Sequence, residues 1–374
     1  MREEKRDNGR SRGGLAAAAA VLGLAAVLAA AGLVFWQETR SGGREYVVLA
    51  AETAGTEGRS KEIEQSETAK AGPGAENPSG PEESSAETEP VQEEPVTLLF
   101  AGDVYLSDHV LGAYQKAGGI HGVLDEGIRE EIRQADLFMV NQEFPFTDRG
   151  TAAADKQYTF RLPPSSVSMF QEMGIDMVTL ANNHILDFGA EGLLDSCSVL
   201  EGAGIRYVGG GPDLERARQL EIVEIKGKKI GFLGTSRVYM DVSWAAGPEH
   251  PGVFSTYDPA QALEAIRAAD SQCDYLVVYV HWGIERNTEP EEYQRTMGRQ
   301  YIDAGADLVV GSHPHVLQEI ETYQGKTIAY SLGNFVFGSS IPQTELLKVV
   351  LDETGAEIST IACTSSGGYT RLAE

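Results

Sequence analysis

The sequence predicts a layered α/β domain with both parallel and antiparallel strand pairs, preceded by a transmembrane helix and a disordered stalk. From residue 96 onward, short apolar runs rich in β-branched residues alternate with helical stretches, a pattern typical of sheets covered by helices. Residues 220–225 and 229–234 flank Lys226-Gly227-Lys228 and are typical of a β-hairpin, which adds an antiparallel pair. Residues 96–374 suffice for one large domain with a substantial core.

The N-terminal region predicts a single-pass membrane anchor. Residues 1–14 contain five basic and three acidic residues, and residues 15–36 form an apolar run without a charge. Such a run can cross the roughly 30 Å of hydrocarbon as a helix. The positive-inside rule places the basic segment in the cytoplasm and the following domain outside the cell, with Trp36 as an interfacial aromatic. A cleaved signal peptide, with its Ala-rich site near residues 29–31, is the alternative.

Residues 37–95 predict a disordered acidic linker. They contain 14 acidic and 5 basic residues, and apart from residues 46–51 they have little apolar material. Such a segment cannot offset the entropy cost of ordering its backbone, so we expect a self-repelling spacer.

Charge and cysteine usage narrow the function classes. The formal net charge of −26 disfavours a nucleic acid partner, because nucleic acid binding normally needs a basic surface. Cys197, Cys273 and Cys363 are scattered without metal-ligand spacing, and their odd number indicates no disulfide framework.

Strands and helices alternate through the domain. The predicted strands span residues 97–100, 137–141, 177–180, 220–225, 229–234, 275–280, 307–310, 327–331 and 346–351. The predicted helices span residues 106–116, 122–134, 165–173, 191–201, 259–269 and 291–304.

Three histidines follow the ends of two strands that are predicted to be buried. His281 follows one strand, and His313 and His315 follow another; ligands of open α/β sheets gather beyond such carboxyl ends. Alternate residues of an extended segment project to one side, so the H-x-H spacing, held extended by Pro314, would turn both imidazoles toward one metal. A hydrogen-bonded structural role is the alternative for any single histidine.

Polar residues also stand where four further strands end. They are Asp103, Asn141 with Glu143, Asn182 to His184 with Asp187, and Asn334. Gly102 before Asp103 would let the backbone approach a ligand closely. Taken singly, each polar residue could instead cap a helix or form a turn.

Six of these groups form a candidate metal site: Asp103, Glu143, Asn183, His281, His313 and His315. Carboxylate, amide and imidazole ligands together suit Zn, Mn or Fe better than Ca or Mg. Six groups exceed the needs of one tetrahedral ion, whereas two ions about 3.5–4 Å apart, bridged by Glu143, would use them all. His184 and Asp187, three residues later, are then the predicted catalytic pair. His184 is not needed as a ligand and is free to protonate a leaving group.

These motifs resemble a known family. The segments GDVYL, NQEFP, YTFRLPP, GIDMVTLANNHILDFG, YVGGG, VYVHWG, GSHPHV and SLGNFVF, within residues 97–338, resemble the CapA family of poly-γ-glutamate capsule proteins and the wider calcineurin-like metallophosphoesterases. The resemblance implies a four-layer αββα sandwich of two mixed sheets, a metal site at one edge, and an outward-facing envelope protein. It implies metal ligation by Asp103, a bridging Glu143, Asn183, His281, His313 and His315, and catalysis by His184.

Two positions depart from the wider superfamily pattern. Tyr105 replaces a histidine two residues after the first acid, and Ile185 replaces an acid after His184. One metal would then be weakly held, unless Asp108 or His109 reaches in from the following helix. A mononuclear site or altered chemistry is the consequence of either change.

Three residues are predicted substrate contacts. Arg161 could bind an anionic group through its fork of donors, with pairing to one of the many acids as the alternative. Asn182 and Asn334 are expected to support the ligands or contact substrate.

The sequence is compatible with three functions. The first is a membrane-anchored hydrolase that acts in the synthesis, export or processing of anionic poly-γ-glutamate with one or two divalent ions. The second is a non-catalytic accessory subunit of a membrane polymer synthase. The third is a generic metallophosphoesterase.

Overall fold

The computed structural model describes residues 94–374. The anchor predicted over residues 15–36 and nearly all of the linker predicted over residues 37–95 lie outside the described residues. Among residues 94–374, no helix is both long and apolar enough to span a bilayer.

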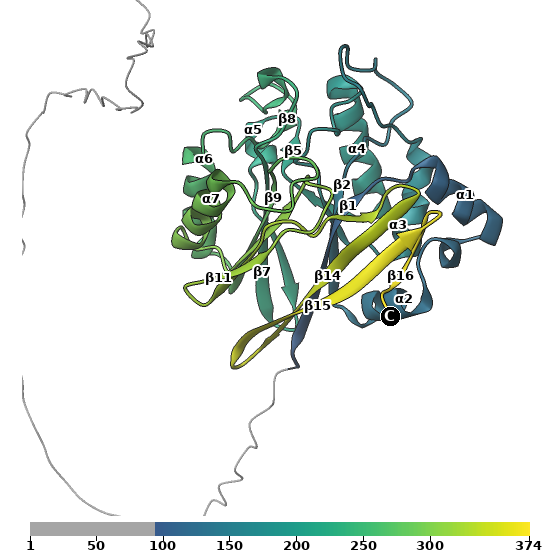
Figure 1. Ribbon diagram of the computed structural model, residues 1–374. Helices are drawn as coiled ribbons and strands as arrows, with labels where there is room; N and C mark the ends of the chain where they lie inside the picture. Colours follow the sequence, from purple (N-terminus) through teal and green to yellow (C-terminus); the bar gives the residue numbers. More distant parts are fainter. Residues whose placement is uncertain (1–93) are drawn as a thin grey trace, which may run out of the picture. The chain divides into compact units, whose positions relative to one another are not determined.

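Two mixed sheets form the body of the domain (Figure 1). The first has the order β16-β15-β14-β1-β2-β3-β4, with β13 also paired to β1. Its strands are β1 (Val96–Val104), β2 (Leu137–Gln142), β3 (Met177–Thr179), β4 (Arg206–Val208), β13 (Asn334–Val336), β14 (Ser340–Asp352), β15 (Gly355–Ser366) and β16 (Tyr369–Leu372). Strands β1 to β4 and β13 are parallel, and β14 to β16 add antiparallel pairs.

The second sheet has the order β11-β12-β10-β9-β7-β6. Its strands are β6 (Glu221–Ile225), β7 (Lys228–Ser236), β9 (Tyr275–His281), β10 (Leu308–Ser312), β11 (Ile320–Tyr323) and β12 (Lys326–Ala329), and β5 (Gly210–Gly211) pairs separately with β8 (Gly252–Val253). The central strands are parallel, and antiparallel β6 and β11 occupy the edges. The predicted α/β fold with mixed sheets, including the hairpin, is therefore confirmed.

Helices cover the outer face of each sheet. They are α1 (Asp108–Ala117), α2 (Glu126–Gln134), α3 (Val167–Met173), α4 (Gly189–Ala203), α5 (Leu214–Ala217), α6 (Ala260–Asp270) and α7 (Glu292–Asp303), with short 3₁₀ turns η1 (Ile120–Gly122), η2 (Pro164–Ser166) and η3 (Val242–Trp244). In Figure 1, α6 and α7 lie on one side of the sheets and α1 to α4 on the other. Helix α2 starts later than predicted because the Asp125 carboxylate caps it, accepting from Ile128 N at 2.8 Å.

The hydrophobic core consists of three clusters of buried side chains. They arise because successive side chains along a strand point to opposite faces of its sheet. Phe100 of β1 and Val277 of β9 belong to the cluster between the two sheets. Leu99, one residue before Phe100, joins the cluster of α1 to α4. Val278 joins that of α6 and α7. The layers are thus helices, sheet, sheet and helices.

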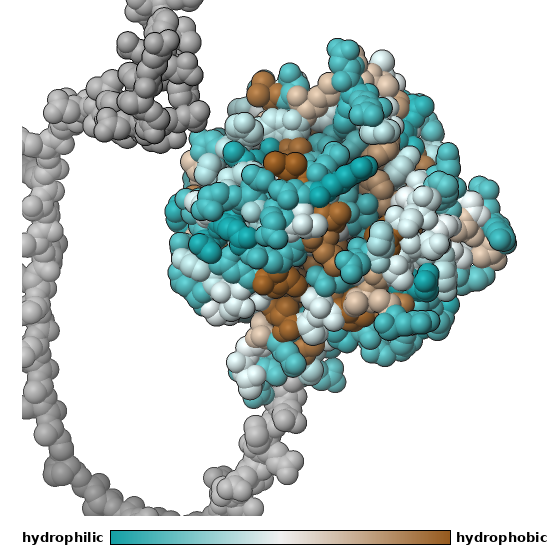
Figure 2. Space-filling view, in the orientation of Figure 1, coloured by the Kyte–Doolittle hydropathy of each residue, from teal (hydrophilic) through white to brown (hydrophobic). Residues whose placement is uncertain are grey.

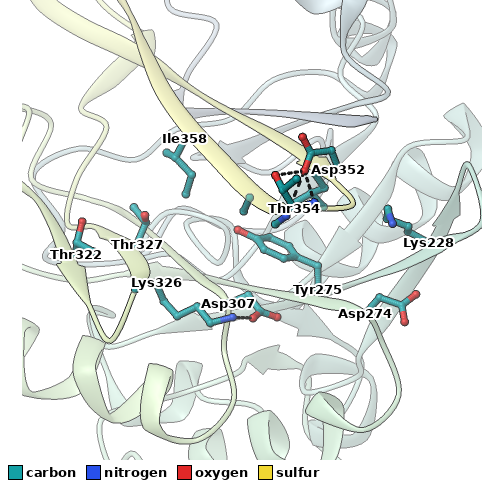
Figure 3. A pocket seen from close by; sticks show the side chains of 14 residues that line it. Lys228, Asp274, Tyr275, Asp307, Thr322, Lys326, Thr327, Asp352, Thr354 and Ile358 are labelled. Carbon is teal, nitrogen blue, oxygen red and sulfur yellow. Dashed lines mark hydrogen bonds and ion pairs between the residues drawn. The ribbon is translucent and has the colours of Figure 1, made fainter. Parts of the chain in front are cut away.

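The amino ends of the parallel strands border a cleft of about 700 Å³ (Figure 3). Tyr275, Asp307 and Lys326 line it from the second sheet, and Asp352 and Thr354 line it from the β14–β15 turn. This cleft lies at the opposite end of the strands from their carboxyl ends.

Exposed apolar side chains gather at the carboxyl ends of the strands. The face shown in Figure 2 is mainly hydrophilic, with a central band of apolar residues. Seven large hydrophobic side chains are exposed among residues 94–374, and five of them lie in the segments that follow β2, β7, β8 and β9: Tyr158, Met240, Val242, Tyr257 and Ile284. These loops, which we call the apolar rim loops, surround the edge described in the next section.

Gly102 is required by a close backbone contact. A Cβ atom at residue 102 would lie 1.8 Å from the carbonyl oxygen of Gly333. That same oxygen accepts a hydrogen bond from Asp103 N at 2.9 Å. Gly102 therefore fixes β1 against the segment that leads into β13.

We predict that Gly102→Ala destabilises the protein by about 3 kcal/mol, because backbone atoms cannot move aside as a flexible side chain would. Gly112→Ala is the matched control, since a Cβ atom at this position in α1 meets open space. The control should change the free energy of unfolding by at most about 1 kcal/mol, in the stabilising direction. Urea unfolding measures the free energy of unfolding of both variants. Equal values for Gly102→Ala and Gly112→Ala would refute this account of the contact.

Candidate metal centre

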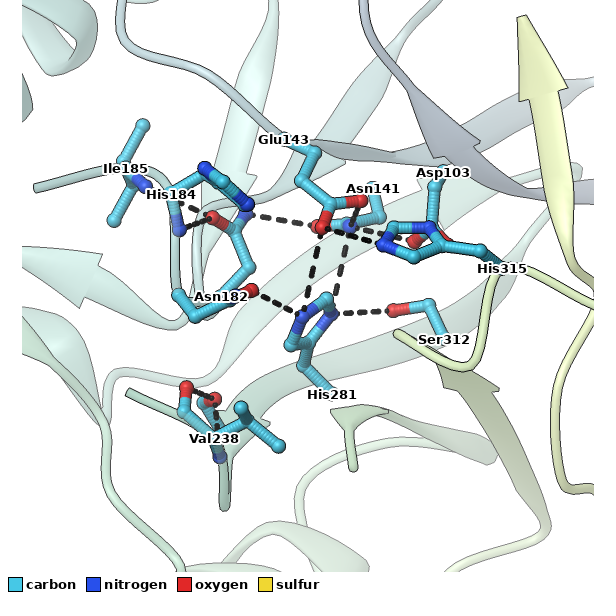
Figure 4. A network of polar contacts seen from close by, with 12 residues as sticks. Asp103, Asn141, Glu143, Asn182, His184, Ile185, Val238, His281, Ser312 and His315 are labelled. Carbon is cyan, nitrogen blue, oxygen red and sulfur yellow. Dashed lines mark hydrogen bonds and ion pairs between the residues drawn. The ribbon is translucent and has the colours of Figure 1, made fainter. Parts of the chain in front are cut away.

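The predicted carboxylate and imidazole ligands meet at the carboxyl-terminal edge of both sheets (Figure 4). Asp103 lies near the end of β1, and Glu143 directly follows β2. His281 is the last residue of β9, and residues 313–315 follow β10. Figure 4 shows Asp103, Glu143, His281 and His315 turned toward one another.

The donor atoms form two groups that share one carboxylate. Glu143, His281 and His313 form the first group, and Asp103, Glu143 and His315 form the second; within each, the donor atoms lie within 4.8 Å of one another. Glu143 Oε1 is 3.9 Å from His281 Nε2 and 3.6 Å from His315 Nε2. This is the arrangement expected of a carboxylate placed between two ions.

The backbone of the H-x-H segment differs from the prediction. His313 has φ 99° and His315 has φ 59°, so both residues adopt left-handed conformations and the extended-segment prediction was wrong. Such values are uncommon for residues other than glycine and persist where the surrounding structure enforces them. The imidazoles converge because the chain turns sharply after β10.

The unsatisfied atoms of the cluster fit a cation. Asp103 Oδ2, Glu143 Oε1 and His313 Nδ1 are buried and make no hydrogen bond of good geometry among residues 94–374. Asp103 Oδ2 lies 3.1 Å from His315 Nδ1, and Glu143 Oε1 lies 3.6 Å from His315 Nε2. Asp103 and Glu143 are 0% exposed, and buried charges are normally paired or bound to metal. The buried histidine, glutamate and aspartate cluster is therefore compatible with metal binding.

Burial controls the protonation of the cluster. Burial raises the pKa of Glu143 well above its usual value, and the Asp103 carboxylate raises it further. Burial lowers the pKa of His281 well below its usual value and the pKa of His313 to about 3. For His315 burial is outweighed by the neighbouring Glu143 and Asp103 carboxylates, which raise its pKa to about 10. His281 and His313 are thus neutral and offer lone pairs to a metal.

Buried polar side chains hold the ligands in place. Asn141 donates to Asp103 Oδ1 at 2.8 Å, and Ser312 Oγ lies 2.9 Å from His281 Nδ1. Asn334 Oδ1 accepts from His315 Nδ1 at 2.8 Å, which leaves Nε2 directed at Glu143. Partners of this kind orient metal-ligating histidines. Ser312 was missed in the sequence, although it directly precedes the H-x-H segment.

Asn182 is buried and supports the loop after β3. It is 0% exposed, and its amide donates to Asn141 Oδ1 and Gln142 O. Its Oδ1 accepts from the backbone N–H groups of His184 and Ile185 at 3.0 and 2.9 Å. Asn182 therefore has the supporting role that was one of its two predicted roles, and Asn334 has it too, because its Oδ1 accepts from His315.

The loop after β3 brings the other predicted residues to the cluster. Asn183 Oδ1 lies 2.9 Å from His281 Nε2. His184 Nδ1 lies 2.7 Å from Asp187 Oδ2, and the pair is 6% and 0% exposed. Burial lowers the pKa of His184 despite the attraction of Asp187. His184 Nε2 makes no hydrogen bond within residues 94–374, so this nitrogen is free to meet a substrate.

Lys156 is the functional residue that sequence reasoning missed. Its Nζ contacts Asp187 Oδ1 and the Asn183 carbonyl oxygen, and lies 3.1 Å from His184 Nδ1. The side chain is only 12% exposed. It stands in a polar loop, away from any strand end, so no pattern in the sequence marks it.

Aromatic rings wall the site where a histidine was expected. Tyr105 stacks on Phe160 at 4.1 Å between ring centroids, and Phe160 stacks on His184 at 4.2 Å. Asp108 and His109 are exposed at the start of α1 and belong to neither donor group. The proposal that they replace the missing ligand was therefore wrong.

Arg161 lies outside the donor cluster. Its guanidinium sits 4.2 Å from the Phe188 ring centroid, and it pairs with no carboxylate among the described residues. The side chain is exposed, next to the Phe160 ring that covers His184.

Comparison with known proteins places this chain in a family. The family model described as "Bacterial capsule synthesis protein PGA_cap" matches residues 97–339. The chain belongs to the PGA_cap family. It is 33% identical over 254 residues to the PGA biosynthesis protein CapA of Bacillus subtilis (strain 168), and 29% identical over 276 residues to the capsule biosynthesis protein CapA of Bacillus anthracis.

These PGA_cap alignments cover 67% and 71% of this chain but 65% and 66% of the two relatives, slightly under two thirds of their lengths. Among solved structures, the protein TT1561 of Thermus thermophilus aligns at 10% identity and a TM-score of 0.38, over 71% of this chain and 99% of that one. A 5'-nucleotidase of Candida albicans aligns at 13% identity and a TM-score of 0.37, over 71% and 51%. At these scores the structural alignments carry no functional argument.

We predict that the purified full-length protein takes up two divalent ions from Zn²⁺ or Mn²⁺ solutions. His281→Ala and His315→Ala should each lose one ion, whereas Glu143→Ala should lose both, because only Glu143 belongs to both groups. His121→Ala, an exposed histidine in η1, is the control and should keep wild-type content. Elemental analysis after gel filtration measures the content, and a wild-type chain that takes up no metal would exclude a metal centre.

Proposed function

We propose that this PGA_cap protein is a membrane-anchored, extracytoplasmic metal-dependent hydrolase or transferase that acts on an anionic γ-linked glutamate polymer during capsule synthesis, export or processing. The observation that carries the proposal is the sharing of Glu143 by two buried donor groups beside the His184–Asp187 pair. The two Bacillus relatives are named for PGA or capsule biosynthesis. The apolar run at residues 15–36 supports the anchor and the outward orientation.

The proposed fold is the calcineurin-like metallophosphoesterase sandwich. Its support is the helix, sheet, sheet, helix order, together with ligands at the carboxyl ends of strands in both sheets. One ion would be held by Glu143, His281 and His313, with Asn183 nearby, and the other by Asp103, Glu143 and His315. Zn, Mn or Fe suits this mixture of donors.

The metal ligands, the His184–Asp187 pair and the aromatic rings have different roles in the proposed reaction. When bound, divalent ions supply Lewis-acid polarisation of a phosphoryl or carbonyl oxygen. Asp187 holds His184 through Nδ1, and Nε2, which has no hydrogen-bond partner among residues 94–374, exchanges a proton with the reacting group. The rings of Tyr105 and Phe160 restrict water beside His184.

Two arginines near the site favour a substrate with negative charge. Arg161 stacks on Phe188, and Arg237 lies 4.5 Å from the ring centroids of Tyr257 and Tyr293. The backbone N–H of Arg237 donates to the His281 carbonyl at 2.9 Å, so this residue lies beside the cluster. Within residues 94–374 neither guanidinium pairs with a carboxylate. In a protein of net charge −26, such arginines are suited to carboxylate or phosphate groups of a ligand.

A non-catalytic accessory role in a polymer synthase complex is the second candidate. The exposed side chains of the apolar rim loops favour contact with another protein. A relative from Mycobacterium tuberculosis, 34% identical over 215 residues, is named a probable polyglutamine synthesis accessory protein. In this case the metal centre would serve only the fold.

The leading proposal predicts turnover that depends on metal and on His184. The full-length protein with Mn²⁺ should cleave γ-linked polyglutamate or bis(p-nitrophenyl) phosphate, and His184→Ala should lower kcat by about 10²–10⁴-fold, as for loss of a general acid–base. His121→Ala should retain the wild-type rate. Cleavage of the phosphodiester alone would indicate a generic metallophosphoesterase, and no turnover of either would refute the enzyme.

A chromosomal His184→Ala substitution separates the two candidates. If the site is catalytic, the encoding bacterium should lose its extracellular polymer while the variant protein accumulates normally, because the side chain lies in the site and not in the core of the sheets. Immunoblotting and assay of released γ-glutamate measure both quantities. Full polymer output from the variant would favour the accessory role.

Arg161→Gln should raise KM by about tenfold with little change in kcat, which is the loss expected when a charge-assisted contact to substrate is removed. Arg267→Gln on α6 is the control, since that side chain is exposed on the far helical layer. Steady-state kinetics on the active substrate provide the test. An unchanged KM would remove Arg161 from the binding site.

A further inference from the structure

Lys156 reaches the His184–Asp187 pair from a different part of the chain. It belongs to the segment between β2 and η2, whereas the pair follows β3. Its ammonium contacts Asp187 Oδ1 and the Asn183 carbonyl oxygen, and it lies 3.1 Å from His184 Nδ1. Its side chain is 12% exposed and that of Asp187 is 0% exposed. A lysine is rarely buried to this degree without a specific partner.

Both oxygens of Asp187 are occupied, and this fixes the rotation of the carboxylate. Oδ1 takes the contact from Lys156. Oδ2 accepts from the backbone N–H of Phe160 at 2.7 Å and lies 2.7 Å from His184 Nδ1. Without the ammonium, Oδ1 would lose its charged partner and the carboxylate would be free to turn.

The same contacts select one tautomer of His184. An ammonium can only donate, and that of Lys156 already donates to Asp187 Oδ1 and to the Asn183 carbonyl oxygen, so Asp187 Oδ2 is the acceptor that lies beside His184 Nδ1. The contact with Asp187 is the shorter, at 2.7 against 3.1 Å, and it joins a donor to a carboxylate. The proton therefore resides on Nδ1, and Nε2 keeps a lone pair.

The loop of Lys156 also fixes the ring itself. Phe160, four residues later, stacks on the His184 imidazole at 4.2 Å, while its backbone N–H holds Asp187. Lys156 additionally holds the backbone carbonyl of Asn183, whose amide oxygen lies at the metal centre. One loop thus restrains the carboxylate, the imidazole and the residue next to them.

We propose that Lys156 is a positioning residue: it locks Asp187 and the Asn183 backbone so that the His184 imidazole is held in one orientation and one tautomer. The rate measurements below rest on the proposed function. The tautomer and metal measurements do not, so failure of one proposal is distinguishable from failure of the other.

The test uses the full-length protein with ¹⁵N-labelled histidine, in which His184 is assigned by the signals lost in His184→Ala. Wild-type His184 should give two widely separated ring-nitrogen resonances, as a single neutral tautomer does. Lys156→Met should bring the two resonances together, because both tautomers become populated. Metal content should stay at the wild-type value, since Lys156 belongs to neither donor group.

Lys226→Met is the matched control. Lys226 Nζ also bridges a carboxylate and a backbone carbonyl, Asp136 Oδ2 at 2.8 Å and Pro95 O at 2.9 Å, but at the start of β1. Its removal should leave the His184 resonances unchanged. If Lys156→Met does not fold, Lys156→Gln, which keeps a donor without the charge, serves as the second variant.

On a cleaved substrate, Lys156→Met should lower kcat by at least about tenfold with KM within about twofold, as expected for a residue acting through the proton-transferring group. Separated His184 resonances and an unchanged kcat in a folded Lys156 variant would overturn the inference. Merged resonances in a protein whose wild type cleaves none of the substrates would uphold the inference and count against the enzyme.

Discussion

The burial of two carboxylates in one cluster is the constraint on which the rest of the site depends. Asp103 and Glu143 are both 0% exposed, and each keeps an oxygen without a hydrogen bond. Taking such charges out of water costs several kcal/mol per ion unless opposite charge compensates it. Among the described residues His315 supplies compensating charge, since these acids raise its pKa to about 10 against the effect of burial. A divalent cation would complete the compensation with the neutral His281 and His313.

This constraint explains the close fit of the strands beneath the cluster. Two sheets must bring their carboxyl ends to one point, and a hydrogen bond from Tyr279 Oη of β9 to the Ala101 carbonyl of β1 joins them at 2.7 Å inside the core. The approach of Gly102 to Gly333 lets β13 lie beside β1, with Asp103 opposite Asn334. Asn334 orients His315, so the geometry of the ligands depends on the packing of β13 against β1.

The sequence predicted the positions of residues at the ends of parallel strands. It did not predict the positions of residues whose placement depends on contacts between loops. Polar residues at the ends of neighbouring parallel strands, such as Asp103 of β1 and Glu143 after β2, had to lie close because these strands end at the same edge of one sheet. The turn of His313 and His315 into left-handed backbone depends on contacts across the sheet, so local pattern favoured an extended segment. Lys156 acts across two loops and leaves no periodic signal. Strands β15 and β16 were missed because their faces are largely exposed and lack clear apolar alternation.

The Asn183 amide makes the two donor groups unequal. The group of Glu143, His281 and His313 also has the Asn183 amide oxygen beside it, 2.9 Å from His281 Nε2. The other group has three residues, and Tyr105 turns its ring to Phe160. Fewer protein ligands leave more of a coordination shell open to water or substrate. If ions occupied both positions, a substrate oxygen would enter more readily at the second, which has fewer protein ligands and lies next to the aromatic wall.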